Sequence, residues 1–65
     1  MKVRDIIKLV EKAGWVLDRT KGSHRQYIHP VKKGTVTIAG KPGVDVPIGT
    51  LKNIYRQAQI PEKED

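Results

Sequence analysis

The sequence predicts an α+β fold in the order α-β-β-β-α, a two-layer sandwich in which two helices cover one face of a three-stranded antiparallel sheet. Two observations predict it. Apolar residues recur at helical spacing near both ends of the chain, and three short segments between them have the alternation or the β-branched content of strands. Gly-containing turns separate these segments, which is typical of antiparallel neighbours. With 65 residues, the chain is expected to form a single domain over 1–65.

The first helix is predicted over residues 2–13. Its apolar residues recur on one face, and its charged residues lie on the other. The apolar set is Val3, Ile6, Ile7, Val10 and Ala13. Gly14 follows directly and is well placed to end the helix, because glycine accepts the left-handed conformation common just after a helix.

A β-hairpin is predicted next, from strands over 15–21 and 24–29. Gly22 and Ser23 between them fit a two-residue turn of type II′, because glycine accepts the positive φ that this turn requires. Pro30 closes the second strand, since it cannot donate a hydrogen bond to a neighbouring strand.

The register of this hairpin decides which face of the sheet His24 occupies. A two-residue turn places Lys21 opposite His24 and Leu17 opposite Ile28, with His24 at the rim of the helix-covered side. A four-residue turn over 31–34 implies a different register, and the two are compatible only if a β-bulge intervenes. The pattern therefore leaves the face of His24 open.

The third strand is predicted over 35–39, after a turn at 32–34, because this segment is rich in β-branched residues. A loop follows over 40–46, where two glycines and a proline interrupt any regular pattern.

The last helix is predicted over 48–59, started by Gly49 and Thr50 and limited by Pro61. Its apolar stripe is Leu51, Ile54, Tyr55 and Ala58. Residues 61–65 are expected to form a short, frayed acidic tail.

The composition narrows the possible functions. The chain has no Cys, which excludes a disulfide framework, a thiolate nucleophile and Cys-ligated zinc. Its seven carboxylates are scattered without metal-ligand spacing, so no metal or other cofactor is expected. The net charge of +6 is typical of a protein that binds nucleic acid. No signal peptide and no apolar run of membrane-spanning length is visible, so we expect a cytoplasmic location.

His24 is the strongest candidate for chemistry. Cleavage of RNA by its own 2′-hydroxyl requires a group that takes the 2′ proton, positive charge on the phosphorane, and a group that protonates the 5′-oxygen. Imidazole titrates near neutrality and can give or take a proton. The charge could come from Lys21, Arg19 and Arg25. The Ser23 hydroxyl and the amides of the Gly22-Ser23 turn could hold phosphate oxygens.

Other candidates carry less weight. His29 is five residues from His24, so in a strand the two should point to opposite faces, and the expected role of His29 is packing or hydrogen bonding just before Pro30. Lys41 is expected to contact RNA, whereas Lys52 and Arg56 on the last helix are left undecided between RNA contact and simple solvation. The aromatic residues have core spacing and do not indicate a base-stacking platform.

Taken together, several motifs resemble HicA-type toxins, a family of small bacterial and archaeal mRNA interferases. The matching motifs are Ala13-Gly14-Trp15 after a basic helix, Lys21-Gly22-Ser23-His24 continuing to Tyr27, His29-Pro30, and Pro47-Ile48-Gly49-Thr50-Leu51 leading into a helix with Ile54, Gln57 and Ala58. They cover nearly the whole chain in the family's order.

This resemblance implies a fold like the double-stranded-RNA-binding domain, metal-independent cleavage of mRNA, and neutralisation by a cognate HicB-type antitoxin. His24 matches the family's catalytic histidine in the Gly-Ser-His motif. One departure concerns Lys41, because many relatives carry a second His there, and Lys at neutral pH supplies only charge.

Two other hypotheses remain. The first is a non-catalytic RNA-binding module that uses the same basic hairpin to recognise A-form shape. The second is a protein-binding subunit whose basic face docks an acidic partner and has no salt-dependent affinity for RNA.

Overall fold

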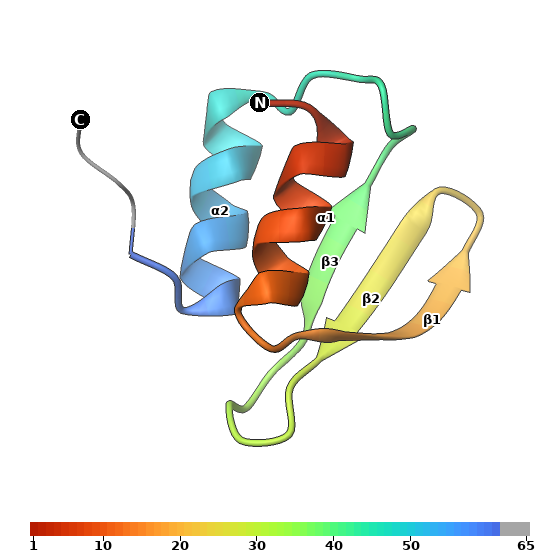
Figure 1. The fold of residues 1–65 in the computed structure, drawn as a ribbon. Helices are drawn as coiled ribbons and strands as arrows, with labels where there is room; N and C mark the ends of the chain where they lie inside the picture. Colours follow the sequence, from red (N-terminus) through yellow and green to blue (C-terminus); the bar gives the residue numbers. More distant parts are fainter. Residues whose placement is uncertain (62–65) are drawn as a thin grey trace.

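The computed structural model describes residues 1–61 and has the predicted order of elements (Figure 1). The elements are α1 (Val3–Lys12), β1 (Val16–Lys21), β2 (His24–Ile28), β3 (Val36–Ala39) and α2 (Ile48–Ala58). The acidic tail was predicted over 61–65, and all of it except Pro61 lies outside the described residues.

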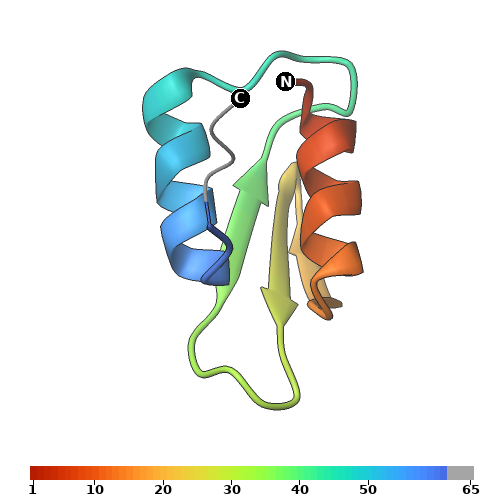
Figure 2. The same ribbon diagram turned by 60° about the vertical axis from the view of Figure 1, so that its left-hand side comes forward.

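The two helices lie on one face of the sheet and begin at the same end of it (Figures 1 and 2). Their apolar stripes meet the inner face of β2 and β3, as the periodicity predicts. The buried core consists of Val3, Ile6, Val10, Trp15, Tyr27, Val36, Ile38, Ile54 and Ala58. The α+β two-layer sandwich is therefore confirmed, with its core between one sheet face and two helices.

The three strands are antiparallel in the order β1-β2-β3. In the β1–β2 register Val16 pairs with Ile28, Leu17 with Tyr27 and Lys21 with His24. The register shifts between Leu17 and Arg19, so this segment contains the bulge that the two competing turn geometries require. Leu17 is consequently opposite Tyr27, not opposite Ile28 as the uninterrupted hairpin predicted.

Strand β1 is the outer edge of the sheet and lies farthest from α2 (Figure 1). All six of its residues are exposed on both faces of the sheet, because β1 lies to one side of the helices, which pack mainly against β3. Strand β1 thus projects beyond the helical layer, whereas β2 contributes Tyr27 to the core. Strand β1 presents side chains that the core does not constrain.

Helix α2 begins at Ile48 as predicted, but the residue that caps it differs from the prediction. The helix begins at Ile48 with Pro47 as its N-cap, and the first helical hydrogen bond runs from the Leu51 N–H to the Pro47 carbonyl at 2.9 Å. Pro47 has φ −58° and ψ 146°, an extended conformation natural to proline that turns the chain into the helix. Thr50 lies inside the first turn and does not cap it.

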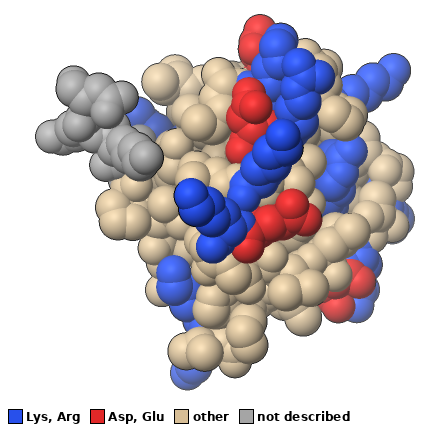
Figure 3. Space-filling view, in the orientation of Figure 1, with Lys and Arg blue, Asp and Glu red and all other residues tan. Residues whose placement is uncertain are grey.

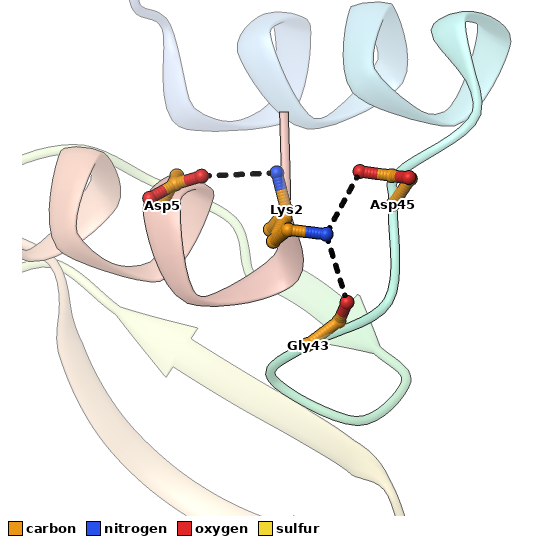
Figure 4. Close-up of polar contacts among 4 residues, drawn as sticks. All are labelled: Lys2, Asp5, Gly43 and Asp45. Atoms are coloured by element: carbon orange, nitrogen blue, oxygen red, sulfur yellow. Dashed lines mark hydrogen bonds and ion pairs between the residues drawn. The ribbon is translucent and has the colours of Figure 1, made fainter.

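The N-terminus ties down the loop over 40–46 (Figure 4). The Lys2 ammonium donates to the Gly43 carbonyl at 3.2 Å and pairs with the Asp45 carboxylate at 3.5 Å. The Lys2 backbone N–H donates to Asp5 at 3.1 Å, which stabilises the first turn of α1. Backbone bonds from Val3 to Val44 and from Arg4 to Pro42 complete the attachment, so this loop has a defined path.

Candidate functional site

His24 lies on the sheet face that the helices leave open. It is the first residue of β2, where it pairs with Lys21 on one side and Ala39 on the other. Tyr27, three residues on, is buried in the core, so the period of two along a strand directs His24 away from the helices. The side chain is exposed, and the small Ala39 leaves room beside it. The structure therefore decides which face His24 occupies, which the sequence pattern alone did not.

The turn before His24 has the predicted conformation. Gly22 has φ +60° and Ser23 does not have a positive φ, which is the combination expected of a type II′ turn. Nothing lies within 4 Å of the position that a Cβ on Gly22 would take, so the turn is open to solvent.

Two cationic side chains share the open face with His24. Lys21 is directly opposite, a position in which Cβ atoms are about 5 Å apart. Arg19 is opposite Gln26, which is two residues along β2 from His24. Arg19 also pairs with Asp18, with 3.3 Å between Nε and Oδ2. Both partners are solvent-accessible, so this pair is weak and an incoming anion can compete for the guanidinium.

The loop after β3 returns to the turn before His24. The Gly40 N–H donates to the Ser23 carbonyl at 3.2 Å, and Arg25 Nη1 donates to the Gly40 carbonyl at 2.9 Å. Gly40 is therefore held from both sides. Lys41 is the next residue, exposed and beside the Ser23 turn, so the fold brings together two segments that are far apart in the sequence.

Arg25 lies on the opposite side of the sheet from His24. It pairs with Ile38, a core residue, and its side chain is half-buried. Adjacent residues in a strand point to opposite faces, so strand geometry alone places His24 and Arg25 on opposite faces of the sheet. Arg19 and Lys21 thus share the face of His24, the Gly40 contact brings the backbone next to Lys41 up to the Ser23 turn, and Arg25 supports that loop.

His29 has the packing role that the sequence predicted. Its ring packs edge-on against Trp15, with 5.2 Å between centroids. Nδ1 accepts the backbone N–H groups of Val31 and Lys32, both at 3.0 Å, and Nε2 lies 3.2 Å from the Ala13 carbonyl. These contacts assign the proton to Nε2, because an Nδ1 that accepts two hydrogen bonds carries none.

The pKa of Tyr27 is raised above its ordinary value of 10.0. Burial is the main cause, and the negative charge of Glu11 adds to it, whereas the positive charge of Arg25 acts in the opposite direction. Tyr27 is thus a core residue that stays neutral, with its ring on the helix-covered face.

A second basic surface runs along α1. Figure 3 shows a row of Lys and Arg side chains with acidic side chains beside it. Arg4, Lys8 and Lys12 are spaced four residues apart on the exposed side of α1, and Asp5 and Glu11 lie on the same helix. This spacing was visible in the sequence, but no role was predicted for it. Because α1 covers the other face of the sheet, this row is separate from His24.

Lys52 and Arg56, which the sequence left undecided, line a hollow on α2 together with Tyr55 and Ile60. Its volume is about 300 Å³. Like the row on α1, it lies on the helical layer and not on the open face. Within residues 1–61, no three His, Asp or Glu side chains group as metal ligands, and no described helix is long and apolar enough to cross a membrane.

Three short antiparallel strands under two helices, in the order α-β-β-β-α, define a protein with the double-stranded-RNA-binding-domain type of fold. The sequence model described as the HicA toxin of bacterial toxin–antitoxin systems matches residues 3–60, and the chain belongs to this family. A solved structure titled HicA3 and HicB3 toxin-antitoxin complex is similar at 27% identity and a TM-score of 0.78, with 97% of this chain and all of the other covered. A comparison with curated proteins yields no match.

Proposed function

We propose that this toxin is an endoribonuclease that cleaves mRNA without a metal ion, with His24 as its acid–base group. The observation that carries the proposal is the position of His24 on the open face, exposed, and flanked by Lys21 and the Ser23 turn. A nucleic-acid strand lying over that face meets an imidazole and at least two cations at once.

The reaction is an internal transfer at phosphorus. The 2′-oxygen forms a bond to phosphorus while the bond from phosphorus to the 5′-oxygen breaks, leaving a 2′,3′-cyclic phosphate and a 5′-hydroxyl. One proton leaves the 2′-hydroxyl and one is delivered to the 5′-oxygen. Imidazole can perform either transfer at neutral pH, which supports His24 in one or both roles.

The charges around His24 suit the phosphorane. Lys21, Arg19 and Lys41 would hold the phosphate oxygens as negative charge develops on them. The Ser23 hydroxyl and the amides of the open Gly22-Ser23 turn would add hydrogen bonds. For Arg25 we propose an indirect role in place of phosphate binding, because its hydrogen bond to the Gly40 carbonyl positions the segment that carries Lys41.

We also propose that a HicB-type antitoxin neutralises this toxin. The similar solved structure is a complex of a HicA and a HicB protein, which supports the pairing. An inhibitor that covers the open face would exclude RNA from His24. A complex that binds RNA as well as the free toxin does would contradict this arrangement.

The test is an incubation of the antitoxin-free protein with labelled single-stranded RNA in EDTA. The wild type should cleave, and the His24→Ala variant should bind RNA but not cleave it. Gln26→Ala is the matched control, since Gln26 lies on the same face two residues away and has no assigned chemistry. RNA with a 2′-deoxynucleotide at the cleaved position should stay intact.

The outcomes separate the hypotheses. Cleavage by His24→Ala at the wild-type rate would remove His24 from the mechanism. Binding without cleavage by any variant, the wild type included, would favour the non-catalytic RNA-binding module.

A further inference from the structure

Four of the seven large apolar side chains that are exposed within residues 1–61 lie in the hairpin or directly after it. They are Val16, Leu17, Ile28 and Val31. Two of them, Val16 and Ile28, form a directly opposed cross-strand pair, and their side chains are 58% and 44% exposed. We call these two residues the aliphatic pair.

The aliphatic pair lies on the same open face as His24. Ile28 is four residues from His24 along β2, so the period of two returns it to the same side, and Val16 faces the same way because it is opposite Ile28. The open face therefore has two ends with different chemistry. His24 and Lys21 lie at the turn end, and the aliphatic pair lies at the other end of the hairpin.

We propose that the aliphatic pair is a docking site for the acidic protein partner, used by the antitoxin and not by RNA. This inference rests on the proposed function, in which the antitoxin covers the open face. A partner that places carboxylates over Lys21 and Arg19 and apolar side chains over Val16 and Ile28 complements both ends at once.

RNA fits the aliphatic pair poorly. Sequence-tolerant RNA binding uses aromatic side chains on which bases stack. The chain has three such residues, of which Trp15 and Tyr27 are buried in the core and Tyr55 lies on α2. Aliphatic side chains give a phosphate backbone neither charge nor hydrogen bonds, so RNA should depend on the cationic end alone.

A second copy of the chain also fits poorly. Each copy has a net charge of +6, and the aliphatic pair lies on the same strands as Arg19 and Lys21. Two copies joined through this face would concentrate positive charge without compensation. An acidic chain is the occupant whose charge matches the surroundings of the pair.

The experiment compares two double variants with the same changes in residue type. Val16→Thr with Ile28→Thr alters the aliphatic pair and keeps β-branched side chains suited to strands. Val44→Thr with Ile48→Thr is the control, because these residues are 51% and 73% exposed but lie in the 40–46 loop and at the start of α2. Each protein is titrated with the HicB-type antitoxin that the proposed function assigns to it, and separately with labelled RNA.

The pair variant should bind the antitoxin at least about tenfold more weakly than the wild type does, because apolar burial is lost at two positions. Its RNA affinity and cleavage rate should stay within about twofold of the wild type, which also shows that it folds. The control variant should match the wild type in both titrations.

Equal antitoxin affinity for the pair variant and the wild type would overturn the docking site while leaving the proposed nuclease intact. Parallel loss of RNA and antitoxin affinity would make the pair part of a shared surface and would overturn the selectivity. If the wild type cleaves RNA but does not bind the antitoxin, the proposed partnership fails, and this inference fails with it.

Discussion

A Cβ atom on Gly14 would lie 2.7 Å from Nε2 of His29. Gly14 also has φ +98°, a conformation that L side chains rarely adopt. The residue that ends α1 thus leaves the space in which His29 reaches the Ala13 carbonyl. The absence of a side chain at Gly14 thus allows His29, which follows β2, to pack against the C-terminal end of α1.

Replacing Gly14 with Ala should therefore destabilise the fold. The strained φ and the contact with a His29 ring held by hydrogen bonds should together lower the free energy of unfolding by ~1–3 kcal/mol. Denaturant unfolding measures this. Gly49→Ala is the control, because Gly49 is helical with open space around it, and that change should raise stability by ~0.5–1 kcal/mol.

Replacement by Ala should lower the stability of the fold at His29 but hardly change it at His24. His29→Ala loses the hydrogen bonds to Val31, Lys32 and Ala13 at ~1 kcal/mol each, so its unfolding midpoint should fall clearly. His24→Ala should change stability by less than ~0.5 kcal/mol, since its side chain is exposed. A large loss of stability in His24→Ala would mean that the open face supports the core.

Trp15→Phe should loosen the C-terminal end of α2. The indole Nε1–H donates to the Ala58 carbonyl at 3.1 Å, and the ring is 1% exposed. Phe removes the donor and leaves unfilled volume, which should cost ~2 kcal/mol of stability. Amide hydrogen exchange should show faster exchange at the last turn of α2 than in the wild type, with little change in the β1–β2 turn.

Stability should fall at high pH because of Tyr27. Its pKa is above 10.0 in the folded state, so the folded chain holds the phenol proton more tightly than the unfolded chain does. The resulting stabilisation is fully present below pH 10.0 and is lost as the pH rises through the folded pKa. The Tyr27→Phe variant has no phenol to ionise. The unfolding free energy of the wild type should therefore fall relative to that of the variant when the pH is raised from about 8 to about 11.

Lys41→Ala should weaken RNA binding and reduce the salt slope of the affinity by about one unit, as expected for the loss of one phosphate contact. Lys33→Ala is the matched control, because Lys33 is an exposed lysine in the loop between β2 and β3. Figure 1 shows this loop at the opposite end of β3 from the loop over 40–46. Equal effects of the two changes would mean that only net charge matters. Lys41→His would show whether imidazole at this position increases cleavage.

The sequence was sufficient for the parts of the fold that depend on periodicity. The spacing of Val3, Ile6 and Val10 predicted the buried face of α1, and the order of elements followed. The two turn registers required a bulge, but the sequence did not show that it lies between Leu17 and Arg19, because two apolar residues followed by four polar ones do not mark which residue is the extra one. It is this extra residue that places Val16, and not Leu17, on the face of His24.

Parts of the site that depend on tertiary contact could not be predicted. Nothing local in the sequence brings the segment that carries Lys41 to the Ser23 turn, because the approach is made by the Gly40 hydrogen bond and by the attachment of the loop to the N-terminus. The opposite sides of His24 and Arg25, in contrast, follow from strand alternation alone. Arg25 was grouped with His24 because the two are adjacent in the chain, but its side chain lies on the other face of the sheet.

The open face also has a consequence for how the protein can evolve. Lys21, His24 and Ile28 contribute almost nothing to the core, which lies entirely on the other side of β2. Substitutions there can therefore alter which molecules the protein engages without an accompanying loss of folding free energy. A toxin and its antitoxin can therefore change together in one lineage until neither recognises the partner from another lineage. The fold of the toxin is unaffected by these changes.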